Sequence, residues 1–263
     1  MSIIAGLIVC PVLAADPSPP TSTVKLIFIH HSCGGNWLAD IGQHEQAGGL
    51  GQALMDNNYF VSATNYGWSV GGDAIGDRTD IGNRWEWFRG PHSGDFTNAL
   101  YNETGQNFEG FGSWSRLTDD PGGENEIIMF KSCYPNSNLQ GDATAAPPAI
   151  DSNPLRGQAW DAGNHTVPNA KGIYIDLLNY FETRQDKLFI AITAPPVQDD
   201  TWADNARAFN TWLVSDWLDD YPHDNVAVFD FYNVLTSNGG NYDVNDYGWA
   251  TGNHHRVIIT TTP

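Results

Sequence analysis

Five short apolar runs recur along the chain and predict the strands of a sheet. Each run is continuous rather than alternating, which is typical of strands buried on both faces of a parallel sheet. The runs cover residues 24–31, 60–67, 126–130, 187–196 and 226–232. We therefore expect a mainly parallel sheet of five strands.

Helical patterns lie between these runs. They predict helices within residues 37–55, 96–101, 173–181 and 202–217. In the last segment apolar residues recur every three or four positions, as on one face of an amphipathic helix. Strands that alternate with helices indicate an α/β fold in which helices cover both faces of the sheet.

Two long segments, 69–125 and 137–169, carry no core pattern of their own. The first is rich in Gly, Asp and Trp, and the second contains many Pro and Ala residues. We interpret both as loops over one face of the sheet, so residues 24–263 form a single domain.

The first fifteen residues are apolar but too short to span a bilayer. They end in small residues, which predicts a cleaved signal peptide over 1–15 and a linker over 16–23. A basic n-region is missing, and a lipoprotein anchored through Cys10 is the alternative. The expected location is therefore extracellular or periplasmic.

The formal net charge of -19 comes from 31 acidic and 12 basic residues. A field of this sign repels nucleic-acid backbones and anionic lipid, so we expect neither as a partner.

Polar and nucleophilic side chains follow three of the predicted strands, and a further group stands near the end of the chain. In open parallel sheets, sites form beyond the carboxyl ends of the strands. The segments found there are His30–Gly34, Asn65–Ser69, Lys131–Ser137 and Asn253–His255. Together they supply a hydroxyl nucleophile, amide donors and imidazole bases, which are the parts that acyl transfer requires.

This order of motifs resembles the SGNH (GDSL-type) hydrolase superfamily over nearly all of the mature chain. HHS takes the place of the family's GDS turn, so the resemblance implies Ser32 as the nucleophile. NYGWS matches the second block and implies that the Gly67 amide helps to form the oxyanion hole. FKSCYPNSN takes the place of the third block, and implies Asn136 as the oxyanion amide beside the Ser32 amide. The implied fold is a three-layer α/β/α sandwich of the flavodoxin-like type.

The last family block, D-x-x-H, is matched only by NHH, so the base is His254 or His255. We favour His254, because it follows a flexible Gly-Asn turn, whereas His255 precedes an apolar run. No Asp lies three residues before either histidine, which leaves a backbone carbonyl or Asp246 as the partner of the base. The third block is also stretched, so Asn138 is an alternative to Asn136.

If Cys10 leaves with the signal peptide, Cys33 and Cys133 remain. An even pair in an exported protein predicts one disulfide. In the fold that the resemblance implies, the two residues follow neighbouring strands. Two buried free thiols are the alternative.

The predicted function is that of a secreted serine esterase that needs no cofactor and acts on an ester such as an acyl group on a carbohydrate. Two other classes stay open. The pairs His30–His31 and His254–His255 contain four imidazoles that suit a metal-dependent hydrolase, although neighbouring residues of a strand point to opposite faces. A non-catalytic extracellular module on a hydrolase fold is the third class.

Overall fold

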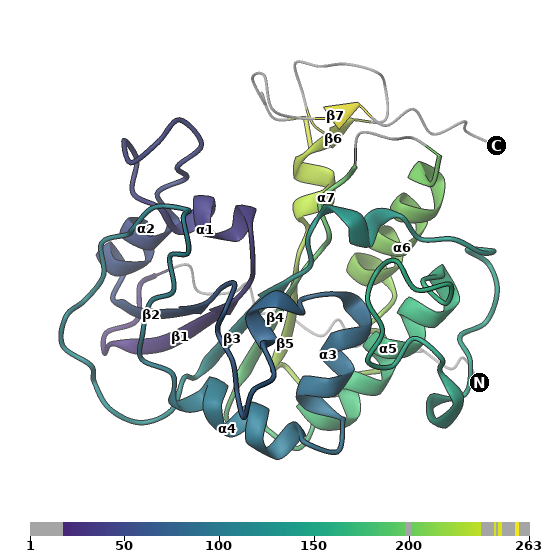
Figure 1. The fold of residues 1–263 in the computed structure, drawn as a ribbon, viewed down its shortest axis with the longest axis horizontal. Helices are drawn as coiled ribbons and strands as arrows, with labels where there is room; N and C mark the ends of the chain where they lie inside the picture. Colours follow the sequence, from purple (N-terminus) through teal and green to yellow (C-terminus); the bar gives the residue numbers. More distant parts are fainter. Residues whose placement is uncertain (1–17, 198–200, 238–244, 246, 249–255, 258–263) are drawn as a thin grey trace, which may run out of the picture.

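The structure is a computed structural model, and it describes residues 18–197, 201–237, 245, 247–248 and 256–257. At its centre is one sheet of five strands, all parallel, in the order β2-β1-β3-β4-β5 (Figure 1). The strands are β1 (Val24–Ile29), β2 (Tyr59–Thr64), β3 (Ile127–Lys131), β4 (Leu188–Ile192) and β5 (Val226–Phe229). The predicted α/β class and the five-stranded parallel sheet are confirmed.

Helices cover both faces of this sheet, as the alternating pattern predicts (Figure 1). The α-helices are α1 (Cys33–Leu38), α2 (Leu50–Asp56), α3 (Ile81–Phe88), α4 (Ser93–Asn102), α5 (Val167–Phe181), α6 (Ala203–Ser215) and α7 (Phe231–Val234). Short 3-10 turns are η1 (Ile75–Asp77), η2 (Tyr134–Ser137) and η3 (Ile150–Ser152). A small parallel pair, β6 (Thr236–Ser237) and β7 (Arg256–Val257), follows α7.

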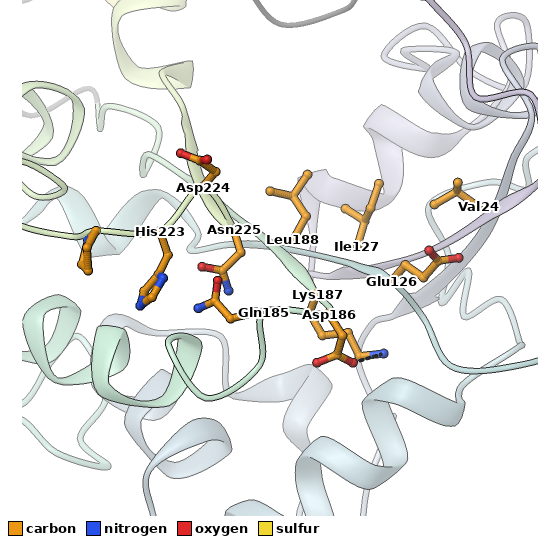
Figure 2. Close-up of a pocket in the computed structure, with 11 residues that line it drawn as sticks. Val24, Glu126, Ile127, Gln185, Asp186, Lys187, Leu188, His223, Asp224 and Asn225 are labelled. Carbon is orange, nitrogen blue, oxygen red and sulfur yellow. Dashed lines mark ion pairs between the residues drawn. The ribbon is translucent and has the colours of Figure 1, made fainter. Parts of the chain in front are cut away.

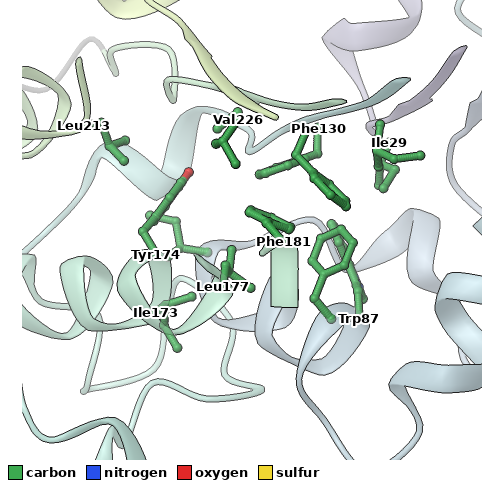
Figure 3. Close-up of a cluster of buried hydrophobic side chains, with 14 of the residues drawn as sticks. Ile29, Trp87, Phe130, Ile173, Tyr174, Leu177, Phe181, Leu213 and Val226 are labelled. Carbon is green, nitrogen blue, oxygen red and sulfur yellow. The ribbon is translucent and has the colours of Figure 1, made fainter. Parts of the chain in front are cut away.

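The larger core lies between the sheet and the helices α3, α5 and α6. Phe130 from β3 packs there against Phe181 of α5 and Phe88 of α3, with ring centroids 6.2 and 6.0 Å away (Figure 3). On the opposite face Phe28 of β1 belongs to a smaller core that includes Trp114. Successive residues of β1 therefore enter opposite cores, because side chains alternate across a strand.

Several predicted helices differ from the observed ones. The segment 37–55 contains no single helix: α1 begins earlier, at Cys33, and a glycine-rich loop separates it from α2. Gly49 there has a φ of 73°, a left-handed conformation that a continuing helix excludes. The sequence pattern does not predict helix α3, and the predicted last strand ends at Phe229, where Asp230 caps α7 by accepting a hydrogen bond from the Asn233 amide.

None of the helices in the described part of the chain has the length and hydropathy that a membrane span requires.

Candidate active site

Ser32 lies three residues beyond β1, at the carboxyl end of the strand. Strand β2 is added on one side of β1 and β3 on the other, so the strand order reverses at this point. This switch point is where open α/β sheets bind their ligands. Its backbone has φ 49° and ψ -128°, a conformation that L-residues rarely adopt. A strained strand-to-helix turn that lifts a serine hydroxyl above the sheet is also the geometry of the nucleophile elbow in α/β-hydrolases.

The hydroxyl of Ser32 does not cap α1. Ser32 occupies the position before that helix, but its side chain makes no capping hydrogen bond. The hydroxyl is instead hydrogen-bonded to the phenol of Tyr66. A capping role, which is the common structural use of serine at this position, therefore does not account for Ser32.

A cleft of about 670 Å³ opens beside Ser32. Its walls come from α1, from the loop before α2 and from segments around Phe111, Tyr134 and Phe231. The lining combines aromatic rings with amide and carboxylate groups. The polar members are Asn36, Glu45 and Gln46, and the aromatic ones are Trp37, Phe111, Tyr134 and Phe231.

The loop after β2 brings Tyr66 and Gly67 to the same edge of the sheet. Gly67 has a φ of 78°, and its amide points at the carboxylate of Asp77, 3.4 Å from both oxygens. The predicted oxyanion donor thus faces an anionic group already. A substrate oxyanion must replace that carboxylate to use the amide.

The carboxamide of Asn136 is fully buried and takes part in two hydrogen bonds. Its Oδ1 accepts from the amide of Ile81 at 2.9 Å, and its Nδ2 donates to Asp80 at 2.5 Å. These bonds fix the start of α3 against the segment after β3. Asn136 is not among the residues that line the cleft, so its oxyanion role stays a prediction.

The alternative, Asn138, is half-buried. Its backbone carbonyl is hydrogen-bonded to the ring of His165 at 3.1 Å.

His30 and His31 diverge, as adjacent residues of an extended chain do. His30 is buried against the Phe28 ring, with centroids 4.7 Å apart, and burial holds the pKa of its imidazole well below the ordinary value. The ring of His31 stacks on Tyr66 at 5.1 Å. Burial, with the charge of Lys131, lowers the pKa of His31 to about 4, although Asp80 and Asp77 oppose that shift.

The two imidazoles therefore do not form one ligand pair. In the ranges that the structure describes, no three His, Cys, Asp or Glu side chains lie close enough together to hold a metal ion.

Cys33 and Cys133 lie side by side beneath the same cleft. Both are half-buried free thiols, and their side chains interact with each other. The contact agrees with the predicted neighbourhood of the two residues. The disulfide itself stays a prediction.

This contact and the Lys131 ammonium lower the pKa of Cys33 to about 6, while burial acts in the opposite direction. The pKa of Cys133 is raised, because its proton is held in the hydrogen bond and its thiol is buried.

The predicted bases His254 and His255, and Asp246, lie outside the described residues. The backbone of Arg256, which follows them, is paired with Thr236. Thr236 comes directly after Leu235, which lines the cleft with Ser32.

A second hollow, of about 560 Å³, lies at the opposite edge of the sheet (Figure 2). It is lined by Val24, Ile127 and Leu188, the first residues of β1, β3 and β4. Lys187 forms an ion pair there with Asp186 at 3.3 Å. Amino ends of parallel strands are not where such sheets place their catalytic groups, so we assign it no role in the chemistry.

Sequence reasoning assigns no role to three groups near this site, Tyr66, Asp77 and Lys131, although Tyr66 and Lys131 stand in the segments beyond the strand ends. Tyr66 stands inside the NYGWS motif, from which the family resemblance singles out only the glycine. Asp77 belongs to a loop without any periodic signal, so its place beside Gly67 follows only from the tertiary structure. Lys131 has the residue type of a surface charge and is nevertheless fully buried.

No family model matches this chain, and neither the curated proteins nor the solved structures contain a significant match to it.

Proposed function

We propose that this protein is an exported serine esterase of the SGNH type, with Ser32 as its nucleophile. One observation carries the proposal: a serine in a rare backbone conformation, with its hydroxyl unused for capping, at the switch point of a parallel sheet and in the wall of a cleft.

In the proposed reaction the Ser32 hydroxyl oxygen attacks the ester carbonyl, and His254 or His255 takes its proton. The tetrahedral oxyanion is stabilised by the amides of Ser32 and Gly67 and by the Asn136 side chain. Collapse expels the alcohol, which receives the proton from the imidazole. Water then cleaves the acyl-enzyme by the same path and releases the acid. No cofactor takes part.

The cleft favours an uncharged acyl group on a carbohydrate as substrate. Aromatic faces such as Trp37 and Phe111 suit the apolar faces of a sugar, and amides such as Asn36 and Gln46 suit its hydroxyls. Glu45 and the negative net charge of the chain disfavour anionic esters.

The test is covalent labelling with a fluorophosphonate, followed by peptide mapping, on the wild type and on Ser32→Ala. We expect one labelled peptide containing Ser32, and a loss of at least about a thousandfold in activated acetate hydrolysis in the variant. A folded wild type that neither reacts with the probe nor hydrolyses esters contradicts the proposal and favours the non-catalytic module. Activity retained by Ser32→Ala contradicts the assigned nucleophile.

A further inference from the structure

A thiol pair stands at the carboxyl ends of two neighbouring strands. Cys33 is the first residue of α1, just beyond β1, and Cys133 lies two residues beyond β3. These strands are hydrogen-bonded neighbours, with Ile29 opposite Phe130. The two thiols therefore lie on neighbouring strand ends, and their side chains interact.

The pair has a buried cation beside it. Lys131 is fully buried, and its Nζ donates to the Ser132 carbonyl at 3.2 Å and contacts the Cys33 thiol. In the described part of the chain no carboxylate forms an ion pair with this ammonium. A buried charge requires an opposite charge close by, and a thiolate at Cys33 would supply one.

The two cysteines are therefore not equivalent. The hydrogen bond from Cys133 and the Lys131 charge favour the thiolate of Cys33, whose pKa is lowered to about 6. The pKa of Cys133 is shifted upward by the same interaction and by burial. Cys33 also lines the 670 Å³ cleft, whereas Cys133 is not among the residues that form its wall.

We propose that Cys33 and Cys133 form a redox-active dithiol, in which Cys33 attacks small-molecule disulfides that enter the cleft and Cys133 resolves the product. This goes beyond the predicted structural disulfide and does not depend on the proposed hydrolase activity.

The exchange proceeds in two steps. The Cys33 thiolate attacks one sulfur of the small disulfide, so a mixed disulfide forms and one small thiolate leaves. Cys133 then loses its proton to that thiolate or to solvent, and its sulfur attacks the sulfur of Cys33. The Cys33–Cys133 bond forms, and the second small thiolate leaves. The protein loses two electrons, and the small disulfide gains them as two thiols.

The buried ammonium makes this disulfide reversible. Lys131 stabilises the reduced form by its attraction to the thiolate, and a stabilised reduced form makes a dithiol pair more oxidising. A structural disulfide that stays oxidised has no thiolate, so a buried ammonium beside it adds no stability. The pair is thus expected to open in mild reductant without unfolding.

The experiment uses the full chain with Cys10→Ser as background, so that only the pair is counted. The reduced protein is exposed to glutathione disulfide under native conditions, quenched with acid and analysed by mass spectrometry. We expect loss of two thiols and a linked peptide that contains both cysteines. Cys133→Ser should instead accumulate a glutathione adduct on Cys33, and Cys33→Ser should react at Cys133 at least tenfold more slowly.

A second measurement tests the cation. Native alkylation by iodoacetamide at about pH 6.5, near the lowered pKa, should modify Cys33 first, and Lys131→Met should slow that reaction several-fold. Glu45→Gln, which removes a charge from the cleft wall, is the matched control and should leave the rate within about twofold.

Three results overturn the proposal. They are adduct formation first on Cys133, equal rates in Lys131→Met and wild type, and thiols that react only after denaturation. Each is measured by mass alone, so the thiol pair can be tested in a protein that has no esterase activity.

Discussion

Ser32 is held in a conformation that its side chain disfavours. At φ 49° and ψ -128° the backbone of a residue that carries a Cβ atom is strained. Such strain costs about 1–3 kcal/mol of stability. The surrounding strand and helix maintain the conformation, which presents the hydroxyl to the cleft. At this residue stability and function are opposed.

Replacement of Ser32 by glycine should therefore stabilise the protein while it removes the proposed nucleophile. We expect Ser32→Gly to raise the free energy of unfolding by about 1–2 kcal/mol over Ser32→Ala, because glycine has no Cβ to strain. At an unstrained position the order is the reverse. Urea unfolding of both variants measures the difference in the free energy of unfolding. A glycine variant that is less stable than the alanine variant would show that the backbone of Ser32 is not strained.

The two histidines after β1 should make the fold sensitive to acid. Burial lowers the pKa of His31 to about 4 and that of His30 well below its ordinary value. Unfolded histidines titrate at about 6.5, so below that pH the unfolded chain binds more protons than the folded one. Stability is then lost as the pH falls from about 6.5, with a slope of up to about 1.4 kcal/mol per pH unit for each histidine.

Urea unfolding between about pH 6.5 and 5 isolates this effect from most carboxylates, whose ordinary pKa values lie near 4. His30→Phe keeps an aromatic ring against Phe28 and cannot take a proton, so its slope should be smaller than that of the wild type. Equal slopes in the two proteins would show that His30 does not titrate on unfolding.

Among the elements, the strands are predictable from the sequence and the short helices are not. A strand buried on both faces leaves a continuous apolar run, and all five runs contain strands of one parallel sheet. Helix α3 has only eight residues, with Gly82 and Asn83 in its first turn. Its place depends on tertiary contacts, such as Asn136 accepting from the Ile81 amide, that no local pattern records.

Helix α1 and the loop that contains Phe111 are packed too closely for any side chain between them. A Cβ on Gly35 would stand 2.4 Å from the Cβ of Phe111. Gly35→Ala should therefore cost about 1–3 kcal/mol, the usual effect of overpacking. Because Phe111 lines the cleft beside Ser32, the variant should also raise KM more than it lowers kcat.

Gly94→Ala is the matched control for that substitution. Gly94 lies in α4, and a Cβ there meets no atom within 4 Å. Alanine should add about 0.5–1 kcal/mol of helix stability at this position. If both alanine variants behave alike in thermal unfolding and kinetics, the close contact between Gly35 and Phe111 is not a constraint.

At the scale of the whole molecule, the rule that sites form at the carboxyl ends of parallel strands locates the candidate site. From the sequence alone it places Ser32 and the two cysteines at one edge, and the structure puts Cys33 beside Cys133 there. That rule does not predict which side chains contact these groups. Asp77 faces Gly67 and Lys131 turns inward because of packing between segments far apart in the sequence.

The general base is the remaining part of the proposed site. Which residue supplies it depends on the segment before Arg256. The pairing of Arg256 with Thr236 fixes a point one residue beyond Leu235, which lines the cleft with Ser32. His255 is adjacent to Arg256 in the sequence and His254 is one residue further. Each residue of extended chain spans about 3.3–3.6 Å, and on this ground we expect one of the two histidines to supply the base.

We expect His254 to be the base, because the Gly-Asn sequence before it predicts a flexible turn, while His255 precedes Arg256 and an apolar run. His254→Ala should lose about a thousandfold in kcat/KM for an activated acetate, and His255→Ala should keep most of its rate.

With no Asp three residues before either histidine, the support from a carboxylate is weak, and activity should rise through a pKa near the ordinary value of about 6.5. Asp246→Asn tests the one acid close in sequence, and a large loss there would show that it orients the imidazole. Reversal of the two histidine variants would assign the base to His255, and full activity in both would exclude the serine–histidine pair.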